Sequence, residues 1–139
     1  MKKEYYNKIK ESYKWFFDNE ERYLILGDDL DSLLSCLLMM QYNPKLKIGY
    51  FYSYDKGLYA NMNTNLSKDK IGVDISLTKG KCISNHMSVL NANDKVNTED
   101  LNMNIINNTT AQNYFYKYNL NTFLLVASLY GHKFKSDKA

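Results

Sequence analysis

Hydrophobic and polar positions along the chain divide into short apolar runs, typical of strands, and longer stretches with helical spacing. Aromatic and apolar residues separated by Lys and Glu predict an amphipathic helix over residues 3–19. Apolar runs predict four strands, over residues 23–26, 47–54, 71–75 and 81–84. Helical spacing predicts three more helices, over residues 31–42, 110–118 and 121–130. The polar segments 56–68 and 88–100 predict loops.

Strands that alternate with helices predict an α/β fold. We expect a mainly parallel sheet flanked by helices on both faces. No internal repeat or linker divides the chain, so we expect a single domain over residues 1–139.

Three acidic residues follow the first predicted strand. Residues 24–40 read LILGDDLDSLLSCLLMM, which places Asp28, Asp29 and Asp31 where a strand passes into a helix. Ligands gather at the carboxyl ends of strands in open α/β sheets, and crowded carboxylates suit a hard divalent cation. A helix start also favours Asp at its N-cap and in its first turn. Three acids exceed that need, and they repel one another unless a positive group joins them.

Two later strands end in residues of similar chemistry. Asp74 interrupts the apolar run of residues 71–75, and the run of residues 81–84 is followed by Asn85 and His86. His86 also has an ordinary interpretation, as a half-buried imidazole with a hydrogen-bond partner. We therefore expect Asp29, Asp31, Asp74 and His86 to converge at one edge of the sheet.

The order of these motifs resembles that of the DHH phosphoesterases, which hydrolyse phosphoesters with two metal ions, usually manganese. The matching segments are residues 29–35, 73–74, 85–87, 91–93 and 125–131. The resemblance implies a DHH-phosphoesterase-like fold and a site for Mn²⁺ or Mg²⁺. Its implied metal ligands are Asp29, Asp31, Asp74 and His86. It further implies supporting or phosphate-contacting roles for Asp28, Asn85 and Ser35.

The chain departs from the family pattern at several ligand positions. The family's earlier His or Asp falls near Ile25 or Gly27, and its second His falls on Met87. Its late Asp falls near His132, which we suggest as a substitute for it, and Asp137 is the acid after the last predicted helix that could complete the site. The Asp of the name motif is Asn85, and residues 1–139 contain no Gly-rich segment like that of the family's substrate domain. We therefore expect at most one weakly held ion.

Two functions follow from this comparison with the family. The first is a degenerate DHH-fold protein, a pseudoenzyme that acts as a binding or regulatory module. The second is an active manganese-dependent phosphoesterase, a hydrolase of nucleotides or short oligonucleotides. The aromatic residues of the predicted N-terminal helix suggest a protein partner or self-association through that helix.

Composition narrows these expectations only slightly. The net charge of +3 is dispersed and does not by itself indicate nucleic-acid binding. Cys36 and Cys82 lie in apolar runs and are expected to be reduced. The sequence shows no signal peptide and no apolar run of membrane length, so we expect a cytoplasmic protein without a membrane partner. Abundant Asn, Lys, Tyr and Ile resemble usage in an AT-rich genome, such as that of a low-GC bacterium or its phage.

Overall fold

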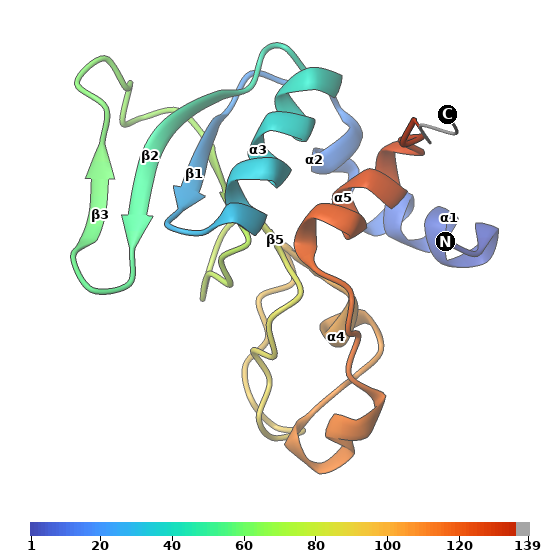
Figure 1. Cartoon of the computed structure of the whole chain (residues 1–139). Helices are drawn as coiled ribbons and strands as arrows, with labels where there is room; N and C mark the ends of the chain where they lie inside the picture. The colour runs from blue at the N-terminus through green and yellow to red at the C-terminus, as the bar shows by residue number, and fades with distance from the viewer. Residues whose placement is uncertain (136–139) are drawn as a thin grey trace.

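A computed structural model describes residues 1–135 as a six-stranded sheet with helices packed against it (Figure 1). The strands are β1 (Tyr23–Gly27), β2 (Lys47–Ser53), β3 (Gly57–Ala60), β4 (Lys70–Val73), β5 (Cys82–Ser84) and β6 (Asp100–Asn102). Their order across the sheet is β3-β2-β1-β4-β5-β6, and only β3 runs antiparallel to its neighbour. The predicted α/β fold with a mainly parallel sheet is confirmed.

The helices are α1 (Lys3–Ser12), α2 (Lys14–Phe17), α3 (Leu30–Tyr42), α4 (Met103–Ile106) and α5 (Thr122–Tyr130), with a 3₁₀ helix, η1 (Ala111–Tyr116). The predicted N-terminal helix is thus two helices. They separate at Tyr13, whose φ of −119° and ψ of 52° are not helical. The break lets Tyr13 and Phe16 both enter the core.

The alternation of side chains along the strands places the main core on one face of the sheet. Leu24, Ile71, Val73, Ile83 and Leu101 point to this face and are at most 2% exposed. Residues of α1, α2, α3 and α5 belong to the same cluster, so these helices contribute to one core. Figure 1 shows α3 and α5 side by side in front of the sheet.

Our expectation of helices on both faces is not met where the strand register can be followed. Gly72, Cys82 and Asp100 lie side by side on the opposite face, in register across β4, β5 and β6. A loop covers this row, since the Leu77 side chain lies against Gly72 and the Leu77 N–H donates to Cys82 Sγ over 3.4 Å. A Cβ added to Gly72 would lie 3.2 Å from Leu77 and Cys82, so a glycine allows this close approach.

Two strands were not predicted: β3 lies within the predicted loop of residues 56–68, and β6 begins at the last residue of the predicted loop of residues 88–100. β3 has mostly exposed side chains, so no apolar run marks it. It pairs antiparallel with β2 after a turn over residues 54–56, and its first residue, Gly57, has a φ of +91°. β6 contains one apolar residue between Asp100 and Asn102, yet all three are buried. The predicted helix over residues 110–118 is shortened to η1, which has non-helical dihedral angles at Asn113.

Arg22 joins the N-terminal helices to the sheet. Its guanidinium donates to both carboxylate oxygens of Asp18 (2.7 and 2.6 Å), to Asp69 (3.0 Å) and to the Trp15 carbonyl (3.1 Å). The arginine side chain is about one-tenth exposed, so these four acceptors compensate a largely buried charge.

Cys36 and Cys82 are both buried and free, in agreement with the prediction of reduced core thiols. Among the helices of residues 1–135, none has the length and apolar character needed to traverse a bilayer.

Candidate functional site

Asp29 and Ser32 join the ends of β1 and β4. Asp29 is the N-cap of α3, and its Oδ1 accepts the Ser32 N–H over 2.8 Å. The Ser32 hydroxyl accepts the Gly27 N–H and donates to the Val73 carbonyl, both over 2.7 Å. A Cβ on Gly27 would lie 3.3 Å from Ser32, so glycine suits this close approach. Asp29 therefore acts as a helix cap, the alternative to a metal ligand that the sequence left open.

Asp31 caps a different helix from its own. Its two carboxylate oxygens accept the N–H groups of Thr122 (2.9 Å) and Phe123 (2.8 Å), in the first turn of α5. The positive end of a helix dipole favours a carboxylate there. Burial nevertheless raises the pKa of Asp31, the two backbone donors act against that rise, and the nearby carboxylates of Asp74 and Asp29 add to it.

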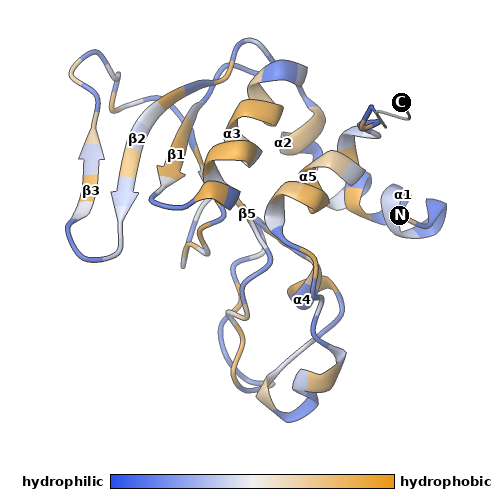
Figure 2. Ribbon diagram, in the orientation of Figure 1, coloured by the Kyte–Doolittle hydropathy of each residue, from blue (hydrophilic) through white to orange (hydrophobic). Residues whose placement is uncertain are grey.

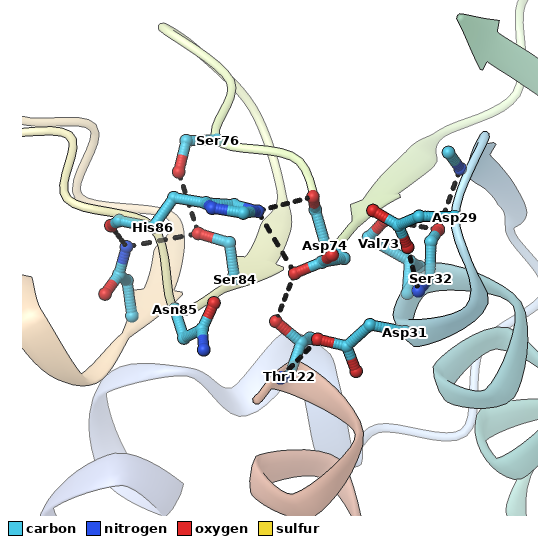
Figure 3. A network of polar contacts seen from close by, with 12 residues as sticks. Asp29, Asp31, Ser32, Val73, Asp74, Ser76, Ser84, Asn85, His86 and Thr122 are labelled. Atoms are coloured by element: carbon cyan, nitrogen blue, oxygen red, sulfur yellow. Dashed lines mark hydrogen bonds and ion pairs between the residues drawn. The ribbon is translucent and has the colours of Figure 1, made fainter. Parts of the chain in front are cut away.

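Asp74 lies at the centre of the site (Figure 3). Its Oδ1 accepts the Thr122 hydroxyl and lies 3.2 Å from Nε2 of His86. The same imidazole nitrogen is 3.1 Å from the Asp74 carbonyl oxygen. Asp74 is 7% exposed and has a φ of +57°, a left-handed conformation that Asp tolerates better than most residues. This conformation ends β4 at Val73, two residues earlier than predicted.

His86 donates its Nε2 proton toward Asp74, because both oxygens that face this nitrogen are acceptors. The hydrogen bond to Asp74 raises the pKa of His86, burial opposes that rise, and the negative charge of Asp74 adds to it. A metal ligand would need this nitrogen unprotonated and turned toward the ion. His86 in this arrangement therefore orients Asp74 and is not free to ligate through Nε2.

Three asparagines, of which Asn102 and Asn104 are buried, hold the end of β5 beside this cluster. Asn85 donates its side-chain amide to the Leu120 carbonyl, and its own carbonyl accepts the Asn104 amide over 2.7 Å. The Asn102 amide donates to the His86 carbonyl over 2.7 Å and to the Ser84 hydroxyl over 3.1 Å. These bonds fix the backbone on both sides of His86.

The structure therefore brings Asp29, Asp31, Asp74 and His86 to one edge of the sheet, as predicted, and Asn85 lies next to them. Asp28 is exposed at the same edge. Ser35 does not join the cluster: it is fully buried on α3, and its hydroxyl has no hydrogen-bond partner.

Of the two candidates for a late ligand, the structure describes His132, and this residue lies away from the cluster. His132 accepts or shares a hydrogen bond with the Tyr42 hydroxyl (3.0 Å) at the C-terminal end of α3, whereas the acids lie at the N-terminal end. The suggestion that His132 substitutes for the family's late Asp was therefore wrong. Asp137 lies outside the described residues. Ile25 is 4% exposed within the sheet and carries no ligand atom.

Thr122, Asn102 and Asn104 belong to the site but were missed from the sequence. Thr122 and the two asparagines are at most 1% exposed, and each bonds a strand-end residue more than ten positions away. An Asn-Thr pair before an apolar helix is a recognisable helix start, and Asn121 is indeed the N-cap of α5. That signal indicated the helix but not the partner of Thr122.

The donor set does not fit a bound divalent ion in this conformation. Asp31 faces two N–H groups, Asp74 faces a hydroxyl and an imidazole, and Asp29 caps α3. Within residues 1–135 no group of three or more His, Cys, Asp or Glu side chains is arranged to hold a metal ion. Protein N–H, O–H and imidazole donors thus contact Asp29, Asp31 and Asp74.

No family model, no curated protein and no solved structure matches the chain.

Proposed function

We propose that this chain is a degenerate member of the DHH-phosphoesterase type, a binding or regulatory module with impaired phosphoesterase chemistry. Two contacts support the proposal most. The Thr122 hydroxyl and the His86 imidazole both face the same oxygen of Asp74, Oδ1. An acid that serves a metal presents its lone pairs to the ion, whereas Asp74 presents them to protein donors.

The residues around Asp74 support the same proposal. Metal-dependent hydrolysis needs an ion that lowers the pKa of a bound water and a substrate held in line with it. Met87 and Asn85 replace two functional residues of the name motif, and Asn85 bonds the Leu120 carbonyl. The Asn85 side chain thus serves the fold, and the family's chemistry would lack two of its usual groups.

The active phosphoesterase is the second candidate, favoured by the convergence itself. Asp31 and Asp74 both bond Thr122, so their carboxylates lie within one small site with His86 beside them. A rearrangement of Thr122 and His86 would be needed before these acids could share an ion. Mn²⁺ or Mg²⁺ at this edge belongs to this second candidate.

Hydrolysis assays distinguish the two candidates. We expect no turnover of a cyclic dinucleotide or a short oligonucleotide by the purified chain with Mn²⁺ or Mg²⁺ present, because the acids are already occupied. The comparison is with Asp74→Ala, and with Asp55→Asn as a control at an exposed acid in a turn. Turnover that Asp74→Ala abolishes and Asp55→Asn preserves would refute the module and establish the enzyme.

A further inference from the structure

The face of the sheet opposite the main core carries a cavity of about 500 Å³. Its lining comes from the loop after β4, from the loop between β5 and β6, and from β6 itself, and it includes Ser76, Leu77, Val89, Lys95, Val96 and Asp100. Figure 2 shows hydrophilic and hydrophobic stretches alternating along the loop between β5 and β6, whereas α3 is mostly hydrophobic. The cavity therefore has both polar and apolar walls.

Asp100 is the buried charge of this lining. Its side chain lies on the same face of the sheet as that of Cys82, its partner in register, and the residue is 1% exposed. Oδ1 accepts the Ser84 hydroxyl over 3.4 Å, whereas Oδ2 is buried and has no hydrogen-bond partner within residues 1–135. Burial raises the pKa of Asp100 to about 6, so the carboxyl is mostly ionised at about pH 7.5. A buried carboxylate oxygen without a donor is unfavourable, and a donor from outside the chain would relieve that cost.

The described part of the chain supplies no cation to Asp100. None of the ion pairs within residues 1–135 includes this acid. Lys95 lines the cavity as well, but it is exposed. A lysine in such a position keeps its ammonium group in water while its methylene groups cover apolar surface. The negative charge in the cavity is therefore unpaired.

The other walls suit an apolar group. Leu77, Val89 and Val96 contribute aliphatic side chains to the lining. Small-ligand sites are typically concave and mostly apolar, with a few placed polar groups and volumes of about 300–1,000 Å³. Hydrogen bonds between charged groups are the strong ones, so a desolvated carboxylate selects a cation with N–H donors. This lining matches an ammonium or amidinium group joined to a compact apolar body.

We propose that this cavity binds a small organic cation, whose ammonium or amidinium group donates to Oδ2 of Asp100 and whose apolar part packs against Leu77, Val89 and Val96. Binding would give Asp100 the donor and the positive charge that the chain does not supply. The inference does not rest on the proposed function, because neither Asp100 nor the three apolar residues belong to the acidic cluster around Asp74.

Titrations followed by ¹H–¹⁵N correlation spectra test the position and the charge preference of the site together. The probes are benzylamine and benzamidine, which are cations at about pH 7.5, and benzyl alcohol is the neutral analogue of benzylamine. We expect both cations to shift the backbone amide signals of Leu77, Val89 and Val96. Benzylamine should bind at least about tenfold more tightly than benzyl alcohol, as one hydrogen bond between charged groups predicts.

Three variants separate the charge from the shape of the cavity. Asp100→Asn keeps the side-chain shape, and it should raise the dissociation constant of benzylamine at least about tenfold and leave that of benzyl alcohol nearly unchanged. Asp55→Asn, the same change in an exposed turn, should leave both constants as in the wild type. Val96→Phe puts a larger side chain at a lining position, so it should weaken both probes and keep their ratio. Dispersed spectra show that each variant is folded.

The proposal would be overturned if neither cation shifted the three amide signals, because the cavity would then hold only solvent. It would also be wrong if benzyl alcohol bound as tightly as benzylamine, or if Asp100→Asn left the affinity for benzylamine unchanged.

Discussion

Thr122→Val is expected to lower the free energy of unfolding by about 2 kcal/mol, since a hydrogen bond to a charged, buried group contributes about 1.5–3 kcal/mol. The Thr122 side chain is fully buried, and its hydroxyl donates to Asp74, which is 7% exposed. Valine keeps the shape of the side chain but leaves that carboxylate with one donor fewer. Urea unfolding at neutral pH measures the change.

Thr122→Ser is the matched control for this experiment. It keeps the hydroxyl and removes only a methyl group, so its loss of stability should be clearly smaller than that of Thr122→Val. Equal stability of the valine variant and the wild type would show that Asp74 does not depend on Thr122.

Asp100→Asn is expected to raise the free energy of unfolding above neutral pH by up to about 3 kcal/mol, because each unit by which the pKa is raised corresponds to about 1.36 kcal/mol. Asp100 is 1% exposed, and its Oδ2 has no hydrogen-bond partner. Burial raises its pKa from 3.8 to about 6, against the smaller effects of the neighbouring Cys82, Asn102, Ser76 and Ser84. The folded protein therefore prefers the protonated acid.

The sign of the pH dependence follows from that preference. The contribution of Asp100 is complete below pH 3.8, the ordinary pKa, and is lost as the pH rises through about 6. Asparagine removes this loss, so the variant should gain on the wild type between about pH 4 and about pH 7 in urea unfolding. Asp55→Asn, at an exposed position, should leave the wild-type profile unchanged. An Asp100→Asn profile parallel to that of the wild type would contradict this assignment.

The sequence predicted the elements whose pattern is local. The apolar run before Asp28 and the helical run after Asp31 correspond to β1 and α3, and the strand ends meet as expected because parallel strands share a carboxyl edge. β6 could not be predicted in this way, because Asp100 and Asn102 are polar residues buried through contacts with distant partners.

The same distinction explains what was found and missed at the site. Asp74 and His86 stand out because acids and histidines are unusual after apolar runs. Thr122 is an ordinary residue at a helix start, and only the fold places its hydroxyl on Asp74, 48 positions earlier in the chain. The role of Asp31 as a cap for α5 depends in the same way on a contact across 91 positions. Residue types alone indicated a cation as the partner of these acids, whereas the structure supplies N–H and O–H donors.

The central proposal is that protein donors hold the acids at this edge and leave room for at most one weakly held ion, and melting with and without Mn²⁺ tests it most directly. We expect a millimolar concentration of Mn²⁺ to raise the melting temperature by no more than about 2 °C, as for at most one weakly held ion, and Asp74→Asn to leave this small response unchanged. A rise of about 10 °C that Asp74→Asn abolishes and Asp55→Asn preserves would contradict the claim, because it would require a tight metal site that includes Asp74.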